Sequence, residues 1–233
     1  MCKIFIRYIA LFFMSSSLAH AVITGYPKDD EIPLLPPYCK VKLLHEKDQW
    51  DQWAATLGEA FGHVHHYCAG LAFINRYNKS FGDKEGRKFY LQSAMGEMDY
   101  MISHVADPRS SILMPEIFFQ RGKLFLLMNM SGNAFKDFEK AIELKPDYLA
   151  PYFALSDFYK EKGDKEKAKA VLGKGLQHSP NSKSLQRRYL ELGGKLSDLP
   201  PIQAAPVEAP AAPVATEPMP KTDAVTNESA PAE

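Results

Sequence analysis

The sequence predicts an all-α fold built from repeated helical hairpins. Between roughly Trp50 and Leu192, glycine and proline are sparse, and apolar residues follow helical spacing without the sustained alternation that indicates strands. Two proline-containing blocks, Lys145-Pro146-Asp147 and Ser179-Pro180-Asn181, lie 34 residues apart. Because such a period is typical of stacked helical hairpins, this region is expected to form one folded domain.

The first 21 residues have the features of a secretory signal peptide. Lys3 and Arg7 precede an apolar run over residues 9–14, and small residues follow, ending in Ala19-His20-Ala21. The run is too short to span a bilayer comfortably, and no second long apolar run follows it. We expect cleavage near Ala21, a periplasmic or secreted location, and no stable membrane insertion. An uncleaved N-terminal anchor is the alternative.

Residues 22–49 are predicted to form an extended N-terminal strap. Pro27, Pro33, Pro36 and Pro37 are expected to interrupt any helix there, because proline disfavours a helix interior and pushes the preceding residue toward extended geometry. The apolar side chains of this strap would lie on the helical body.

Cys39 and Cys68 are the cysteines that remain once Cys2 has left with the signal peptide. Thiols in an oxidising compartment tend to be paired, so a Cys39–Cys68 disulfide is the economical interpretation. Closing a loop over a separation of 29 residues would stabilise the fold by about 3.5 kcal/mol. Two free buried thiols are the alternative.

Residues 50–112 are predicted to form a degenerate helical hairpin, with helices near 62–79 and 87–105. The run Ala69-Gly70-Leu71-Ala72-Phe73 has small residues followed by an aromatic one, which allows close helix packing. Further support for this hairpin comes from its position beside clearer repeats, since an array of about three units is expected for stability.

The same region holds the one constellation that could carry chemistry, His63-Val64-His65-His66-Tyr67-Cys68. Imidazoles at this spacing can ligate zinc or copper, which makes His63, His65 and His66 candidate metal ligands. The only carboxylate at ligand spacing is Glu59, and Cys68 already has an expected partner. A structural role for the histidines is therefore favoured, no cofactor is expected, and an exported metal-binding or redox-related factor is the alternative function.

Residues 113–196 contain the clearest repeat. Aromatic, small and proline residues recur with the 34-residue period at seven pairs of positions, namely Phe118 and Tyr152, Gly122 and Ser156, Phe125 and Tyr159, Ala134 and Ala168, Phe138 and Leu172, Ala141 and Gly175, and Pro146 and Pro180. Small side chains facing large ones let two helices approach closely. Gly132-Asn133 and Gly163-Asp164 are predicted turns.

From Pro115 to Pro180 this pattern resembles the tetratricopeptide repeat. Arg121 and Gly175 depart from it, because leucine and alanine are usual there. The resemblance implies a short right-handed solenoid of about three hairpins, with the degenerate region as the first. Residues 182–192 would be the capping helix that such arrays need at their end, with Lys183, Arg187 and Arg188 exposed.

The resemblance also implies a concave groove that binds a peptide or partner helix. The residues that would face this groove are Glu116, Phe119, Gln120, Lys123, Leu127, Phe153, Asp157 and Lys160. Phe119 and Phe153 are expected to be aromatic anchors, which makes a polar clamp for a carboxylate doubtful. Intramolecular packing of the two rings is the alternative.

The predicted function is therefore a non-enzymatic, exported scaffold for a protein or peptide partner, and its role could include cell-envelope assembly. Residues 22–196 hold 25 basic and 22 acidic side chains, which is no nucleic-acid footprint. No phosphate-binding loop or nucleophile elbow occurs. The oligomeric state is not indicated.

Residues 197–233 are predicted to be a disordered tail. Eight prolines and nine alanines dominate the segment, so it has too few large apolar side chains to offset its ordering entropy. A passive solubilising tail is favoured over a docking strand.

Overall fold

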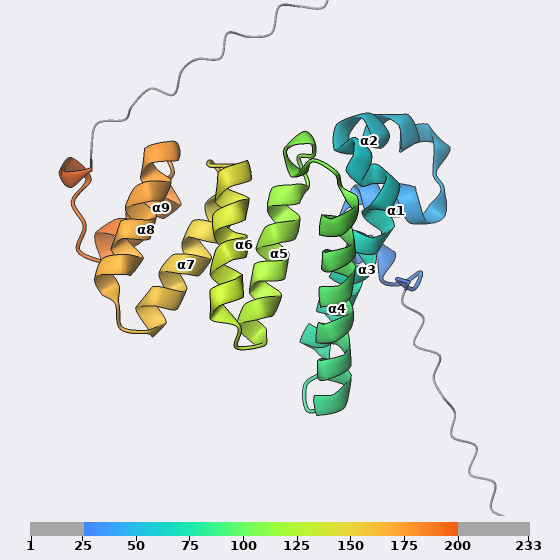
Figure 1. The fold of residues 1–233 in the computed structure, drawn as a ribbon, viewed down its shortest axis with the longest axis horizontal. Coiled ribbons are helices and arrows are strands. Elements are labelled where there is room, and N and C mark those ends of the chain that lie inside the picture. The colour runs from blue at the N-terminus through green and yellow to red at the C-terminus, as the bar shows by residue number, and fades with distance from the viewer. Residues whose placement is uncertain (1–25, 200–233) are drawn as a thin grey trace, which may run out of the picture. The chain divides into compact units, whose positions relative to one another are not determined.

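The computed structural model describes residues 26–199, and this range is helical without any strand (Figure 1). Its helices are α1 (Pro37–Leu44), α2 (Trp50–Leu57), α3 (Glu59–Lys79), α4 (Lys84–His104), α5 (Met114–Leu127), α6 (Ser131–Leu144), α7 (Leu149–Glu161), α8 (Lys165–His178) and α9 (Lys183–Glu191). Short 3-10 turns are η1 (Ile32–Leu34), η2 (Lys47–Gln49), η3 (Pro108–Ser110) and η4 (Leu196–Asp198). The predicted signal peptide and residues 200–233 lie outside the described residues.

The helices pair into three hairpins, α3 with α4, α5 with α6, and α7 with α8. Each hairpin packs on the next through α4 against α5 and α6 against α7, and α9 follows on α8. Figure 1 shows the paired helices in a row that follows chain order. The predicted all-α fold of stacked hairpins is confirmed.

The extended strap predicted for residues 22–49 is wrong where α1 forms. Pro36 is the N-cap residue of α1 and Pro37 lies in its first turn. Proline is well tolerated there, because the first N–H groups of a helix have no intrahelical partner and the fixed φ of proline suits a helix. The prolines therefore set where this helix begins instead of preventing it.

Helix α2, which sequence analysis did not separate from the first hairpin, covers α1 and α3 through aromatic contacts. Gly58 separates α2 from α3 with a φ of 58°. The ring of Trp53 meets Tyr38 edge-on with centroids 5.5 Å apart, and Trp50 meets Phe61 in the same way at 4.9 Å. These contacts hold the N-terminal helices on the face of α3.

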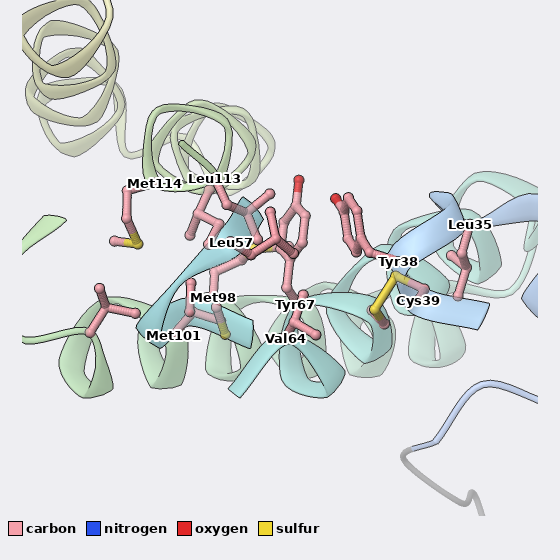
Figure 2. Packing of buried hydrophobic residues seen from close by; sticks show 14 of the residues in the cluster. Leu35, Tyr38, Cys39, Leu57, Val64, Tyr67, Met98, Met101, Leu113 and Met114 are labelled. Atoms are coloured by element: carbon pink, nitrogen blue, oxygen red, sulfur yellow. A yellow bond between two sulfur atoms is a disulfide. The ribbon is translucent and has the colours of Figure 1, made fainter. Parts of the chain in front are cut away.

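Cys39 of α1 and Cys68 of α3 form a disulfide, with Cα atoms 5.6 Å apart (Figure 2). The predicted pairing is thus present, and both residues are fully buried. They belong to an apolar core that runs from the N-terminal helices into the second hairpin and includes Leu35, Tyr38, Leu57, Val64, Tyr67, Met98, Met101, Leu113 and Met114. The disulfide therefore ties α1 to the main core.

Gly122 permits the close approach of α5 and α6. A Cβ atom at this position would lie 2.5 Å from Cε1 of Phe138 and 3.2 Å from the backbone oxygen of Ala134. Phe138 is fully buried, so its ring has no open space to move into. This close contact explains why the repeat requires a small residue at position 122.

The two predicted turns differ in outcome. Gly163 takes a φ of 79°, and Asp164 caps α8 by accepting a hydrogen bond from the backbone N–H of Lys167. Gly132 and Asn133 instead lie inside α6, because the preceding turn uses Asn129 with a φ of 60°. Asparagine adopts this left-handed region more readily than most non-glycine residues.

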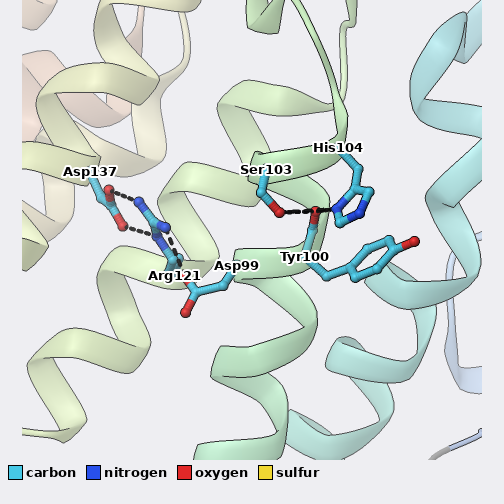
Figure 3. Close-up of polar contacts among 6 residues, drawn as sticks. All are labelled: Asp99, Tyr100, Ser103, His104, Arg121 and Asp137. Carbon is cyan, nitrogen blue, oxygen red and sulfur yellow. Dashed lines mark hydrogen bonds and ion pairs between the residues drawn. The ribbon is translucent and has the colours of Figure 1, made fainter.

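Arg121 joins three helices (Figure 3). Its guanidinium donates hydrogen bonds to Asp137 of α6 and to Asp99 of α4. Burial lowers the pKa of Arg121, but the hydrogen bonds to the two carboxylates raise it by more. The arginine that stands here in place of the usual leucine therefore links the first hairpin to the second.

The C-terminal cap forms as expected, but the folded unit extends further than predicted. Ser182 caps α9 by accepting a hydrogen bond from the backbone N–H of Leu185, which is fully buried against the last hairpin. Beyond α9, Leu199 packs on the same apolar cluster as Leu185. The compact unit ends at Leu199, so residues 197–199 are not part of the tail.

Candidate functional site

A hollow of about 320 Å³ lies between the first helices of the first two hairpins, α3 and α5. It is lined by Ile74, Asn78, Gln120, Lys123, Leu124, Leu126 and Leu127. Ile74 and Asn78 are four residues apart, so they share one face of α3, and Gln120, Lys123 and Leu127 share one face of α5. Leu127 is 49% exposed. The hollow therefore offers an accessible apolar surface between two helices.

Lys123 is the cation of this hollow. Its Nζ donates a hydrogen bond to Oε1 of Gln120 at 3.2 Å and lies 5.5 Å from the centroid of the Phe119 ring. Burial lowers the pKa of Lys123, and the carboxylate of Glu116 opposes this shift. The ammonium group of Lys123 is thus a hydrogen-bond donor next to the apolar side chains of the hollow.

Glu116 lies on the same face of α5, seven residues before Lys123. Burial is the main cause that raises the pKa of Tyr38, Tyr67 and Tyr148, and the negative charge of Glu116 is the second cause for all three. Figure 2 shows the hydroxyl groups of Tyr38 and Tyr67 turned to the same side. Both hydroxyls are buried, and that of Tyr38 has no hydrogen-bond partner in the described part of the chain. The Glu116 carboxylate helps to raise the pKa of Tyr67 both by its charge and as a hydrogen-bond acceptor. The exposed face of α5 therefore carries an acid at one end and a base further along.

The two predicted aromatic anchors are occupied by contacts within the chain. Phe119 packs on Phe138 and Tyr148, with ring centroids 5.7 and 5.5 Å apart. Phe153 lies under the guanidinium of Arg188, at 4.6 Å from its ring centroid. Both rings are half-buried, so they offer only part of their surface to a partner.

Two of the three predicted groove residues of the last hairpin lie in a different hollow, of about 600 Å³, between α7 and α9. Asp157 and Lys160 line it together with Arg187 and Arg188. The structure therefore divides the eight predicted residues. Gln120, Lys123 and Leu127 meet in the first hollow, Asp157 and Lys160 in the second, and Glu116, Phe119 and Phe153 line neither.

The residues that complete these two hollows were not predicted from the sequence. Ile74 and Asn78 come from the degenerate hairpin, where the repeat pattern was too weak to assign a groove face. The spacing of Tyr67, Leu71, Ile74 and Asn78 along α3 was the available signal, since it marks one helical face. Arg187 and Arg188 were expected to be exposed on the capping helix, but their place beside α7 was not foreseen.

The histidines suggested as metal ligands form ring contacts and a hydrogen bond with neighbouring side chains. Nδ1 of His66 lies 2.6 Å from Oε2 of Glu97, and the ring of His66 stacks on Tyr100. Tyr100 in turn stacks on His104, and Figure 3 shows these two residues. His65 lies against His66, and burial is the main cause that lowers its pKa. No group of three or more metal-binding side chains occurs within residues 26–199.

Comparison with known proteins supports the repeat assignment. Residues 115–148 and 149–182 each match the tetratricopeptide repeat family. A thermophilic tetratricopeptide-repeat protein of Thermus thermophilus, known from its crystal structure, is 22% identical, with a TM-score of 0.47 over 66% of this chain and 75% of that chain. No curated protein sequence matches this chain.

The helices between residues 26 and 199 include none with the length and apolar character needed to cross a membrane. The matched stretches coincide with α5 and α6 and with α7 and α8. Residues 115–182 are therefore two tetratricopeptide repeats.

Proposed function

We propose that this protein is an exported, non-enzymatic scaffold that binds a peptide or a partner helix along the exposed faces of α3 and α5. The observation that carries the proposal is the hollow between these helices, with Leu127 half exposed at its edge. Tetratricopeptide repeats generally serve as protein-interaction scaffolds, and the second hairpin that lines this hollow is such a repeat.

The chemistry of the hollow defines the partner. Ile74, Leu124 and Leu127 would take an apolar side chain, since burial of apolar surface is the main driving force of association. Lys123 and Gln120 supply polar groups at the same place, which would fix the register of the bound segment. The partner is therefore an amphipathic segment with at least one apolar anchor.

Export belongs to the proposal as well. The charged and apolar pattern of residues 1–21 supports it, and so does the disulfide between Cys39 and Cys68, because such bonds persist in oxidising compartments. A role in cell-envelope assembly is the setting in which an exported interaction scaffold would act.

Site-specific photo-crosslinking in the living cell tests the proposal. A photoreactive residue replaces Leu127 in one variant and Lys136, an exposed residue of α6, in another. We expect a discrete protein adduct from position 127, absent from position 136. Adding Ile74→Asp should abolish the adduct, because a charge in the hollow would oppose apolar burial.

Two results would contradict the proposal. One is an adduct of the same mass and yield from both positions, which would indicate random collision. The other is an adduct from position 127 that persists with Ile74→Asp while the variant remains folded, because the partner would then not depend on the hollow.

A further inference from the structure

The hollow between α7 and α9 has a basic lining. Four basic side chains and two acidic ones contribute to it, namely Lys160, Lys165, Arg187, Arg188, Asp157 and Glu191. With about 600 Å³ of space, it is large enough to admit side chains of another molecule. Leu192, which is partly exposed, adds an apolar surface beside these charges, and Leu172 lies fully buried beneath.

Arg188 is held in place and still has donors to offer. Its Nη1 donates to both carboxylate oxygens of Asp157, at 2.8 and 2.9 Å, and the ring of Phe153 supports the guanidinium from one face. Nε and Nη2 form no hydrogen bond within the described residues. A guanidinium has a planar set of donors that matches a carboxylate, and here its position is fixed before any ligand arrives.

The neighbouring cations are weakly engaged. Lys160 and Lys165 form no ion pair in residues 26–199, and Arg187 approaches Glu191 only at 3.8 Å. Four basic side chains face two acidic ones, so the lining keeps an excess of two positive charges. Such a surplus attracts an anionic group from outside.

We propose that the hollow between α7 and α9 is a second binding site that takes the carboxylate side chains of an acidic partner segment. The partly exposed side chain of Leu192 favours a peptide, because aspartate or glutamate next to an aliphatic residue can use both the cations and this leucine. Asp157 and Glu191 disfavour a run of phosphates, and the near-neutral charge of the folded region provides no extended basic track for nucleic acid.

This inference does not depend on the hollow between α3 and α5, because no residue lines both. A single partner could occupy the two hollows with different parts of its chain. The experiment below includes Ile74→Asp, so failure of one site is distinguished from failure of the other.

Fluorescence polarisation with two labelled peptides tests the second site. In the probe, aspartate and glutamate alternate with leucine; the comparison peptide has asparagine and glutamine in their place. We expect the probe to bind the full chain at least about tenfold more tightly than the comparison peptide. Lys160→Gln/Lys165→Gln, which keeps the pair between Arg188 and Asp157, should weaken binding about five- to tenfold.

The matched control is Lys183→Gln/Lys195→Gln, which removes the same charge from exposed positions outside the hollow. It should change the affinity by less than about twofold, and Ile74→Asp should leave it unchanged. Arg188→Gln should abolish selectivity for the acidic peptide, with circular dichroism confirming the fold. Equal losses in the two lysine pairs, loss of binding with Ile74→Asp, or displacement of the probe by an equal concentration of a single-stranded oligonucleotide would each overturn the proposal.

Discussion

Arg121 donates two hydrogen bonds to Asp137, from Nε to Oδ2 and from Nη2 to Oδ1, both 2.8 Å long (Figure 3). The side chains are 19% and 6% exposed, so the pair is largely removed from water. Nη1 of Arg121 reaches Asp99 of the preceding hairpin at 2.8 Å. One guanidinium thus fixes α5 against α6 and the first hairpin against the second.

Removal of Asp137 should be costly. Asp137→Ala leaves a largely buried guanidinium with only the more exposed Asp99, and the free energy of unfolding should fall by about 3–5 kcal/mol. Arg121→Leu/Asp137→Ala should be less destabilised than Asp137→Ala alone, because no unpaired charge remains. Urea unfolding of the two variants and of Arg121→Leu completes a double-mutant cycle. A double variant as unstable as the single one would show that the pair is not the cause.

Gly122 should not tolerate a methyl group. Gly122→Ala would force the new Cβ against Phe138, and we expect a loss of about 1–3 kcal/mol in thermal or urea unfolding. Gly96 of α4 is the matched control, since a Cβ there meets nothing within 4 Å. Gly96→Ala should stabilise the protein by about 0.5–1 kcal/mol through helix propensity. Similar effects of the two substitutions would refute the close-contact explanation.

The disulfide between Cys39 and Cys68 should contribute measurably to stability. Cys39→Ala/Cys68→Ala should lower the free energy of unfolding by about 2–5 kcal/mol, because the unfolded chain gains conformational freedom. Peptide mapping without reductant should find one cross-linked pair in the exported protein. Two freely alkylated thiols in the native protein would contradict this prediction and weaken the case for export.

Stability should fall as the pH rises above about 10. Burial is the main cause that raises the pKa of Tyr38 and Tyr67, and it raises the pKa of Tyr148 and Tyr152 to about 12 each. An unfolded tyrosine loses its proton near pH 10, so above this pH the unfolded chain is favoured, and the stability is lost progressively up to about pH 12.

Melting curves between pH 9 and 12 check the alkaline prediction. Tyr38→Phe is the informative variant, because its hydroxyl has no hydrogen-bond partner among the described residues. It should cost little at pH 7 and reduce the alkaline loss. An unchanged alkaline loss in this variant would mean that Tyr38 does not contribute.

The repeats could be predicted from the sequence because their constraints are local and periodic. Gly122 and Phe138 lie in one hairpin, and their contact recurs wherever two helices must approach closely. Helix α1 was missed because a proline can begin a helix as well as end one, and Pro37 alone does not distinguish the two.

The hollows could not be predicted in full because they form between units. Ile74 meets Lys123 only after two hairpins have stacked, and Arg188 meets Asp157 only through the packing of α9. Neither pair has a fixed sequence spacing that a repeat pattern would reveal. The groove residues expected on α5 came from the resemblance to the tetratricopeptide repeat, whereas their partners on neighbouring helices depend on tertiary packing.

Hydrogen–deuterium exchange with and without the partner recovered by crosslinking at position 127 tests the central claim most directly. We expect slower exchange of amides in the second half of α3 and in α5 when the partner is bound, with little change in α4 and α6. Ile74→Asp should remove this protection at the same partner concentration. Protection confined to α4 and α6, or unchanged exchange in α3 and α5 at saturating partner, would contradict it.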